Sequence, residues 1–403
     1  MSSENESSRH IAIIGSGPTG LEAALAAAER GLSFTLYEAG PAPASSVSAW
    51  GHVRLFTPWS LNLSPRMRNA LRESAHQIPP DDDFPTGHEL VERGLIPVVD
   101  ATLRDRLALE SRIRHIGRDG LLKNEEIGSE RRSQTPFRLV VENGAGTERV
   151  ETADVVLDCS GTWGNPNALG TGGVPAPGES AAGNGIVREI PDVVTDEGTW
   201  AGRTTLLVGA GHSAQTAAVA LAGLAERHPG TRVLWAFRGE PAAWSPDPDD
   251  PLPGRAQLLR DAARLVQDPD SAVEPIDHVA VDSLDRSGER WQVTLRRTDG
   301  STRTVEADRV LALTGFVPDA SIYRQLQVHE CYATSGPMKL AAALLGSGND
   351  CLAQETHGAE TLLNPEPNFF ILGAKSYGRN NTFLMRVGWE QVDEVFSLID
   401  PPS

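Results

Sequence analysis

Residues 10–38 read HIAIIGSGPTGLEAALAAAERGLSFTLYE. The β-branched run at 11–14 predicts a buried parallel strand, and it leads directly into a G-x-G-x-x-G pattern. The Ala/Leu-rich segment that follows predicts a helix, which Gly31 ends. A second strand is predicted over 33–37, and Glu38 comes directly after it. Strand, glycines, helix, strand and acid in this order predict a βαβ unit that binds a dinucleotide, against the alternative of a purely structural glycine turn.

The residues of this glycine-rich turn have separate expected roles. Gly15 makes the tight turn, Gly17 lets the backbone approach a pyrophosphate, and Gly20 lets the helix pack closely on the strand. The free N–H groups at the start of the helix hold the phosphate charge. Glu38 lies where an acid accepts hydrogen bonds from the hydroxyl groups of the ribose. The expected cofactor contacts of this unit are Gly15, Ser16, Gly17, Pro18, Thr19, Gly20 and Glu38.

A second part of the chain repeats this logic. Residues 204–208 predict a strand, GAGHSA follows at 209–214, and a helix and a strand are predicted over 215–227 and 232–236. Ala replaces the third glycine, which is a tolerated variant. For the histidine of this turn, helix capping or packing and a catalytic role are both open. The expected contacts of the second module are Gly209, Gly211, His212, Ser213 and Ala214.

The duplication extends beyond the two glycine-rich turns. Residues 137–161 align without gaps with residues 291–315, and Asp154 matches Asp308. Each copy predicts a hairpin followed by a strand. Such a repeat indicates two related modules in one chain. The two copies end in Ser-Gly and Thr-Gly, at Gly161 and Gly315.

The composition of the 403-residue chain is that of a globular protein large enough for two or three domains. Its formal net charge of −18 argues against nucleic acid or an anionic membrane as a partner. The three cysteines, Cys159, Cys331 and Cys351, form no C-x-x-C pattern, which suits a reduced, cytoplasmic protein. No signal peptide, membrane span or metal site is expected.

Residues 50–62, WGHVRLFTPWSLN, show neither strand alternation nor helical spacing. Several large aromatic side chains in a short irregular segment are costly to expose to water. One interpretation is a loop packed beneath the first domain. The other is a loop that covers a planar cofactor and lines the substrate pocket, in which case the candidate catalytic residues are His52, Arg54, Trp59 and Asn62.

Two dinucleotide modules in one chain resemble the two-dinucleotide-binding-domain flavoproteins, and above all their flavin-containing and N-hydroxylating monooxygenases. The resemblance rests on both glycine-rich turns, on CSGTWGNPN at 159–167, on LTGFVPD at 313–319 and on PTGHELVERGL at 85–95. In this family the first module binds FAD, the second binds NAD(P)H, and a C-terminal strand, loop and helix return to the flavin. The resemblance therefore adds Arg54, Gly161, Gly315, Gly373, Asn381 and Thr382 to the expected cofactor contacts.

The fold that the repeats and the resemblance predict is α/β, with two Rossmann-like βαβ domains that each carry a β-hairpin or meander. The FAD-binding domain is split in sequence, and the NAD(P)H-binding domain is inserted into it. The expected boundaries are 1–195 and 316–403 for the two parts of the FAD domain and 196–315 for the insertion. The second part contains a strand at 369–372 and a helix at 382–398, whose amino end would stabilise negative charge on the flavin.

The chain departs from the family pattern in three places. The family continues the glycine at 373 with Asp, whereas this chain has Ala374 and Lys375, so the ribityl contact of that Asp is missing. The F-x-G-x-x-x-H pattern before the second module is absent in its usual form, and Arg188 stands where a His is expected. There is no C-x-x-C, and a dithiol relay needs two thiols within bridging distance. The last departure argues against a disulfide reductase.

The resemblance implies an FAD-dependent NAD(P)H oxidoreductase, with a monooxygenase as the first interpretation. Such an enzyme forms a flavin C4a-hydroperoxide from dioxygen and transfers oxygen to a small substrate that reacts through a soft N, S or Se atom. Two alternatives remain: a reductase that passes electrons to a quinone or a protein, and a non-catalytic redox-sensing flavoprotein. Besides the residues of 50–62, hydrogen-bond donors for the flavin are expected from Asn380, Asn381 and Thr382.

Arg238 bears on the choice of nicotinamide coenzyme, because it follows the second strand of the second module. NAD-specific sites place an acid near this point, whereas a guanidinium suits the 2′-phosphate of NADPH. NADPH is therefore expected, with NADH and an exposed turn arginine as the alternative, and Arg255 is a second candidate contact. The expected partners are a small-molecule substrate and dioxygen, and a homodimer is left open.

Overall fold

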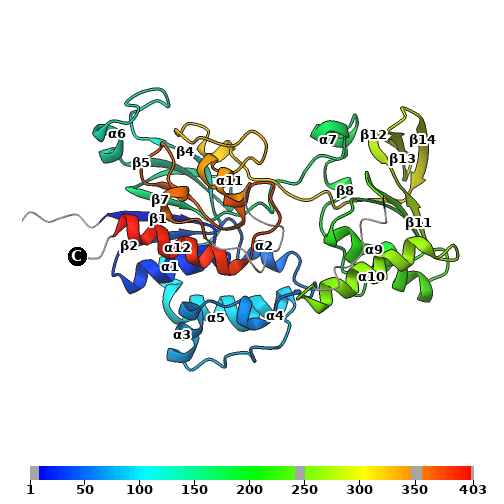
Figure 1. Ribbon diagram of the computed structural model, residues 1–403, viewed down its shortest axis with the longest axis horizontal. Coiled ribbons are helices and arrows are strands. Elements are labelled where there is room, and N and C mark those ends of the chain that lie inside the picture. The colour runs from blue at the N-terminus through cyan, green and yellow to red at the C-terminus, as the bar shows by residue number, and fades with distance from the viewer. Residues whose placement is uncertain (1–8, 241–249, 346–355, 401–403) are drawn as a thin grey trace, which may run out of the picture. The chain divides into compact units, whose positions relative to one another are not determined.

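The structure, a computed structural model, has an α/β fold (Figure 1). Each of its two units contains a five-stranded parallel sheet and a three-stranded antiparallel sheet. In each unit, helices cover one face of the parallel sheet and the antiparallel sheet covers the other. The described parts of the chain are residues 9–240, 250–345 and 356–400.

The first unit contains the residues up to Asn165 and from Val317 onward, and the second unit is Pro166–Phe316. The first domain is therefore split in sequence and the second is inserted into it. The first boundary falls at Asn165 and not near residue 195, because β8 (Ile186–Val187) pairs with a strand of the inserted unit. Residues 166–195, which were expected to belong to the FAD domain, are therefore part of the inserted unit.

The parallel sheet of the first unit has the strand order β16-β7-β1-β2-β3. Side chains alternate between the two faces of a strand, so Ile11 and Ile13 face the helices while Ala12 and Ile14 face the antiparallel sheet. All four are buried, as an uninterrupted apolar run in a central parallel strand requires. The strands are β1 (His10–Ile14), β2 (Ser33–Tyr37), β3 (Leu107–Ala108), β7 (Val155–Asp158) and β16 (Phe369–Ile371).

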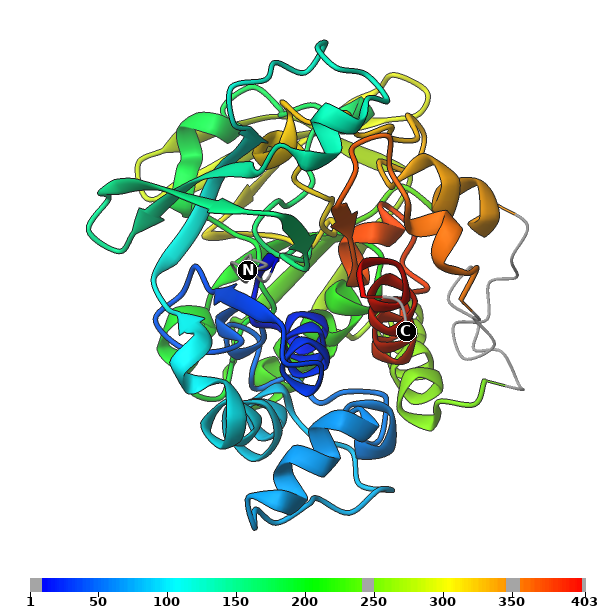
Figure 2. The ribbon, with the colours of Figure 1, turned by 90° about the vertical axis from the view of Figure 1, so that its left-hand side faces the viewer.

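Two helices, α1 (Pro18–Glu29) and α12 (Met385–Ile399), lie side by side on one face of this sheet (Figure 2). The Ala-rich α1 is buried almost all round, because its small side chains let it approach both the sheet and α12. The closing helix α12 begins at Met385 and not at residue 382, since Asn380 accepts hydrogen bonds from the backbone and hydroxyl of Thr382 and so forms a turn.

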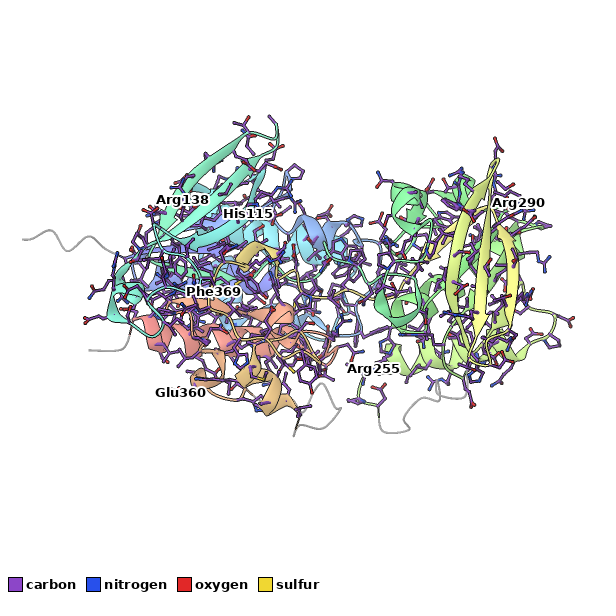
Figure 3. The ribbon with its side chains drawn as sticks, turned by 90° about the horizontal axis from the view of Figure 1, so that it is seen from above. His115, Arg138, Arg255, Arg290, Glu360 and Phe369 are labelled. Carbon is purple, nitrogen blue, oxygen red and sulfur yellow. The ribbon has the colours of Figure 1, made fainter. Side chains whose placement is uncertain are left out.

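An antiparallel sheet covers the other face of the parallel sheet. Phe137, Leu139 and Val141 alternate along one of its strands and pack in the same buried cluster as Ile14. Arg138, which lies between two of them, is exposed, as Figure 3 shows. This sheet consists of β4 (Ser111–Arg118), β5 (Phe137–Asn143) and β6 (Glu148–Ala153).

A helical segment separates β2 from β4. It starts with α3 (Pro65–Glu73), whose N-cap Ser64 accepts a hydrogen bond from the Met67 N–H. A longer helical run follows, and the capping box of Thr86 and Glu89 begins it. Two wide turns interrupt its regular hydrogen bonding on either side of a proline. This run consists of α4 (Gly87–Leu90), the wide turn Val91–Leu95, α5 (Ile96–Val98) and the wide turn Val99–Leu103.

The inserted unit repeats the same arrangement. Its parallel sheet has the order β11-β10-β9-β15-β8, with α9 and α10 on one face and β12-β13-β14 on the other. Leu207 and Trp235 face the helices, while Leu206 and Leu234 face the antiparallel sheet. The elements are β9 (Thr204–Val208), α9 (His212–Arg227), β10 (Arg232–Ala236), α10 (Pro253–Gln267), β11 (Val273–Ile276), β12 (Val279–Ser287), β13 (Arg290–Arg297), β14 (Thr302–Ala307) and β15 (Arg309–Ala312).

The repeat seen in the sequence is a structural repeat. Asp154 and Asp308, which the alignment matches, make the same contacts in the two units. Asp154 donates its N–H to the His10 carbonyl and accepts the His10 N–H at 2.8 Å. Asp308 does the same with Thr204, at 2.7 Å. In both units the aspartate thus locks the end of the meander to the start of the first strand.

The remaining helices are short and connect these elements. Within the described residues, none of the helices has the length and apolar character needed to cross a membrane. They are α2 (Ser45–Ser48), α6 (Glu130–Gln134), α7 (Glu179–Ala182), α8 (Glu197–Trp200) and α11 (Met338–Leu344).

A buried ionic cluster ties the edge of the first unit together. Glu366 is 1% exposed, and its carboxylate contacts Arg118 at 2.8 Å and Arg132 at 2.7 Å. It also accepts the Gln327 N–H at 2.8 Å. Burial alone would raise the pKa of Glu366, but hydrogen bonds from Arg132, Gln327 and Arg118 outweigh it, so the pKa is lowered. One carboxylate therefore compensates two guanidinium groups that have lost their water.

We predict that Glu366→Gln lowers the free energy of unfolding of the first unit by about 3–5 kcal/mol, because it leaves two buried cations without a counter-charge. Urea unfolding monitored by circular dichroism measures this. Glu142→Gln is the matched control, because its pair with Arg114 lies at the surface, and it should unfold at nearly the wild-type urea concentration. Equal midpoints for the two variants would contradict the prediction.

Candidate functional site

The glycine-rich turn of the first unit connects β1 to α1, as predicted. Gly15 has φ +94°, and a Cβ there would lie 2.8 Å from the Cys159 carbonyl oxygen. A Cβ on Gly20 would lie 1.8 Å from the Gly15 carbonyl oxygen, so both positions require glycine. Gly17 has open space around it and is the N-cap of α1. A ligand can therefore approach the backbone at Gly17, while the other two glycines allow the close packing.

Glu38 lies directly after β2 and is 7% exposed. One carboxylate oxygen accepts hydrogen bonds from the Ser16 N–H at 3.1 Å and hydroxyl at 2.5 Å. The other accepts the Gly40 N–H at 2.8 Å. The acid is thus held against the glycine-rich turn, at the carboxyl end of the sheet where parallel sheets bind ligands.

A cavity of about 490 Å³ opens beside this turn, and all of its lining residues belong to the first unit. That volume is within the range of small-molecule and cofactor sites. Of the predicted FAD contacts in the first unit, six line it, whereas Ser16 lies beneath Glu38 and Gly20 against Gly15. The six are Gly15, Gly17, Pro18, Thr19, Glu38 and Gly161.

The residues present fit a dinucleotide. No side chain caps the amino end of α1, so its first N–H groups are available to a phosphate. Gly161, at φ +67° with open space around it, lines the cavity directly after β7. Apolar side chains from the C-terminal segment, Phe383 and Met385, line it as well. A helix end without a side-chain cap, a buried acid and an apolar wall therefore share one cavity.

Gly373 and Lys375 bring the C-terminal segment to the same cavity. A Cβ on Gly373 would lie 2.6 Å from the Thr19 hydroxyl, so the chain passes very close to the glycine-rich turn. Lys375 lines the cavity, and its ammonium forms a fully buried ion pair with Asp158 at 2.7 Å. The sequence pattern marked Lys375 only as a departure from the family and gave no indication of a role for Asp158. The sequence does contain a hint of Asp158, because VVLD at 155–158 ends an otherwise apolar strand with a charged residue.

Cys159 also lines the cavity, but its surroundings make it a packing residue. It is 8% exposed, and burial together with the neighbouring Asp158 carboxylate raises the pKa of its thiol. Cys159 and Cys331 are both unpaired, and Cys351 lies outside the described residues. A protonated buried thiol is a poor nucleophile.

The predicted catalytic residues of 50–62 do not line this cavity. Trp59 is 1% exposed in the hydrophobic core, and Asn62 is fully buried. The Asn62 amide donates to the Thr57 and Pro58 carbonyls at 2.8 and 2.9 Å, so it closes a turn. For Trp59 and Asn62 the packed-loop interpretation therefore holds, because both side chains are consumed by packing and by the backbone of their own loop.

The other two members of this segment are also placed away from the cavity. Arg54 donates a hydrogen bond to the Phe84 carbonyl and forms an isolated bridge with Thr86. His52 keeps one buried ring nitrogen, Nε2, without a hydrogen-bond partner in the described part of the chain. The expected FAD contact of Arg54 is thus not made through this cavity, since its guanidinium holds the neighbouring loop.

Asn380, Asn381 and Thr382 lie in the turn before α12 and not on its first turn. The cavity is lined by Phe383 and Met385, which come directly after them, and not by these polar residues. The amino end of α12, at Met385, therefore lines the cavity as a helix end at the flavin would require, whereas Asn381 and Thr382 precede it in the turn.

The glycine-rich turn of the inserted unit has the same construction. Gly209 has φ +138°, and a Cβ there would lie 2.2 Å from the Leu313 carbonyl oxygen. Gly211 is the N-cap of α9, so His212, Ser213 and Ala214 form the first turn. His212 is therefore not the N-cap. Burial lowers the pKa of its imidazole, and the nearby positive charge of Arg255 lowers it further.

Arg238 and Arg255 lie at the two ends of the segment after β10. The Gly209 N–H bonds to Ala236 as the Gly15 N–H bonds to Tyr37, so Phe237 is the counterpart of Glu38. Phe237 is 2% exposed, and Arg238 follows it at the surface. Arg255, on α10 (Figure 3), pairs with Asp250 through two hydrogen bonds of 2.8 and 2.7 Å. The inserted unit thus has no acid at the position of Glu38, and an arginine comes next.

Gly315 follows β15 at φ +83°, and its carbonyl accepts the Asn167 N–H at 2.9 Å. It is the counterpart of Gly161 in the first unit. Within the described residues, His, Cys, Asp and Glu side chains form no cluster that could hold a metal ion.

Comparisons with known proteins agree with this geometry. Residues 10–144 match the family described as FAD dependent oxidoreductase. No curated protein matches the sequence. Among solved structures, the bacillithiol disulfide reductase Bdr (YpdA) of Bacillus cereus is similar, with 19% identity, coverage of 97% of this chain and 98% of that chain, and a TM-score of 0.66.

Two N-hydroxylating enzymes are similar to the same extent. The FAD-bound cadaverine monooxygenase DfoA of Erwinia amylovora has 14% identity, covers 99% of this chain and 95% of its own, and gives a TM-score of 0.64. The ornithine N-hydroxylase KtzI of Kutzneria sp. 744, solved with reduced FAD and NADP⁺, has 14% identity, with 98% and 99% coverage and a TM-score of 0.62. Residues 10–144 are thus similar to FAD-dependent oxidoreductases, and the chain as a whole shares the fold of these solved structures.

Proposed function

We propose that the protein is a monooxygenase that uses FAD and NADPH to transfer one oxygen atom from dioxygen to a small molecule with a reactive N, S or Se atom. The observation that carries this proposal is the combination of two phosphate-binding turns, one in each unit, with the absence of any C-x-x-C in the sequence. The sequence thus lacks the C-x-x-C pair through which a flavin would pass electrons to a disulfide.

The residues of the first unit have distinct parts in this function. The turn at Gly15–Thr19 and the amino end of α1 bind the pyrophosphate, and Glu38 accepts hydrogen bonds from the adenosine ribose. Phe383, Met385 and Ile322 exclude water from part of the cavity. The bound FAD supplies the hydride acceptance and the oxygen chemistry.

The surroundings of Cys159, the cysteine that lines the cavity, favour oxygen transfer over disulfide reduction at this site. The thiol of Cys159, beside the cavity, has a raised pKa and therefore stays protonated at neutral pH. The similarity of the fold to a disulfide reductase does not decide the reaction, since one fold hosts several chemistries and the reaction depends on the side chains of the site. A reductase acting on a quinone or a protein, and a non-catalytic sensor, are outcomes of the experiment below.

The coenzyme preference is argued from the inserted unit. Phe237 cannot accept hydrogen bonds from ribose hydroxyl groups, whereas Glu38, its counterpart in the first unit, can. Arg238 follows Phe237, and a guanidinium can bind a 2′-phosphate through two parallel hydrogen bonds. Arg255 lies close enough to His212 to influence its pKa, which places a second cation near the phosphate-binding turn. These features favour NADPH over NADH.

We predict that NADPH reduces the purified FAD-loaded protein without oxygen, and that mixing with oxygen then gives a transient spectrum that belongs neither to reduced nor to oxidised flavin. Stopped-flow absorbance and a hydrogen peroxide assay test this. Direct reoxidation with stoichiometric peroxide would rule out the monooxygenase and favour a reductase. Failure of NADPH to reduce the flavin would favour the sensor.

We predict that Arg238→Ala raises KM for NADPH about tenfold or more, because it removes charge-assisted hydrogen bonds to the 2′-phosphate. KM for NADH should change by less than about twofold, since NADH has no such phosphate. Steady-state oxidation of each coenzyme measures the effect. Arg232→Ala is the control, because Arg232 is exposed at the opposite end of β10. An equal loss with NADPH and NADH would refute the assignment.

A further inference from the structure

A short crossing takes the chain of the first unit from its parallel sheet to its antiparallel sheet, beside the candidate ribose-binding acid. The Glu38 N–H donates to the Ala108 carbonyl at 2.9 Å, and the Ser111 N–H donates to the Glu38 carbonyl at 2.8 Å. Two residues lie between these partners, and the second of them, Glu110, has φ +48°. The start of β4 is therefore fastened to the residue that ends β2.

The inserted unit has the same crossing. The Phe237 N–H donates to the Ile276 carbonyl, and the Val279 N–H donates to the Phe237 carbonyl, both at 3.1 Å. Again two residues lie between the partners, and the second, His278, has φ +54°. The strands β4 and β12 thus start at equivalent places, so their residues can be compared one by one.

This comparison matches Arg112 of β4 with Ala280 of β12. Their partners on the neighbouring strands are Glu142 and Arg296, which the gap-free alignment of the two hairpins also matches. Both strands carry a bulge directly after the next residue. The residues on either side are buried in both units. The two units therefore differ at this position by a large cationic side chain.

Arg112 lies at the 490 Å³ cavity of the first unit. Ser111, Arg112 and Ile113 all line it, although neighbouring side chains of a strand point in opposite directions. The cavity therefore meets β4 along its edge, and no other strand covers that edge, because β4 is the first in the order β4-β5-β6. Ile113 belongs to the buried cluster beneath this sheet, whereas Arg112 is on the exposed face. A flat group at the edge would have Arg112 on its outer side.

The guanidinium of Arg112 is available to a ligand. The residue opposite it, Glu142, accepts hydrogen bonds from Arg114 on both carboxylate oxygens, at 3.0 and 2.6 Å. Arg112 is only a minor cause of the lowered pKa of Glu142. Its exposed side chain makes no hydrogen bond or ion pair with any other residue in the part of the chain that the structure describes. A ligand would therefore not have to displace a partner.

The base of an adenosine belongs at this end of the cavity. Glu38 is placed to hold the ribose, and the Ser111 N–H bonds to its carbonyl, so the edge of β4 lies beside the ribose position. An adenine ring is flat and carries no charge, so the contact that suits its face is a planar one. A guanidinium group is planar and stacks on aromatic rings and on nucleobases.

We propose that Arg112 is a cofactor-binding residue whose guanidinium stacks on the outer face of the adenine ring of FAD. This contact distinguishes the first unit from the inserted unit, where Ala280 cannot make it. The inference rests on the proposed binding of FAD in the first unit, but not on NADPH or on oxygen transfer.

The decisive variant is Arg112→Ala, which gives the first unit the side chain that the inserted unit has at this position. We expect Kd for FAD and Kd for ADP to rise about fivefold or more and by similar factors, because both ligands carry the adenosine. Flavin fluorescence measures FAD binding to the apoprotein, and calorimetry measures ADP binding. The apoprotein should melt at the wild-type temperature, since an exposed side chain without a partner contributes little to folding.

A second variant, Arg112→Lys, separates stacking from attraction to the phosphates. Lysine keeps the charge but has no planar group, so Kd for ADP should stay raised nearly as far as in Arg112→Ala. Recovery of the wild-type Kd by lysine would overturn the inference and favour a phosphate contact. Arg138→Ala is the matched control, because Arg138 is exposed on the same antiparallel sheet (Figure 3) and does not line the cavity. Its Kd values should equal those of the wild type.

Three further results would overturn the inference, and they are distinguishable. If the wild type binds FAD and Arg112→Ala binds FAD and ADP equally well, only the inference about Arg112 fails. A loss of affinity for FAD without a loss for ADP would put the contact outside the adenosine. If the wild-type apoprotein binds neither FAD nor ADP, the proposed function fails together with the inference.

Discussion

The arrangement of helix and sheet in the first unit depends on the close contact between the end of β1, the start of α1 and the end of β7. There the Gly15 backbone touches the Cys159 carbonyl, and Gly20 touches Gly15. Neither contact leaves room for a Cβ atom, so the helix can approach the sheet only if both residues are glycine. Because the helix starts so close to the strands, its first N–H groups face the cavity at the carboxyl edge of the sheet.

The inserted unit obeys the same constraint with different residues. Gly209 touches the Leu313 carbonyl, and Asp308 anchors the meander as Asp154 does in the first unit. The two units differ, among other places, directly after the second strand of the sheet. Glu38 follows one sheet strand, whereas Phe237 and Arg238 follow its counterpart. The same arrangement of strands and glycine-rich turn thus carries a different residue after the second strand in each unit.

The buried ion pairs of this protein differ in role from those at its surface. The chain carries a formal net charge of −18, and most of its ion pairs lie at the surface, where they contribute little. Two buried clusters are different. The Arg118–Glu366–Arg132 cluster stabilises an edge of the first unit, whereas the Asp158–Lys375 pair borders a cavity.

The sequence by itself determined the two βαβ turns and the duplicated hairpins, because these depend on local patterns: apolar runs, glycine spacing and a repeat that aligns without gaps. The split of the first domain followed from the family resemblance, and its first boundary lies at Asn165. It did not determine which polar side chains meet. The aromatic segment at 50–62 has the composition of a binding loop. In the structure, however, the side chain of Trp59 is buried in the core, and that of Asn62 is buried and hydrogen-bonded to the backbone of its own loop. Asp158 and Lys375 are 217 residues apart (375 − 158) and become partners only when β7 and β16 pair side by side. Such contacts follow from strand order, which no local pattern encodes, so the tertiary structure alone decided them.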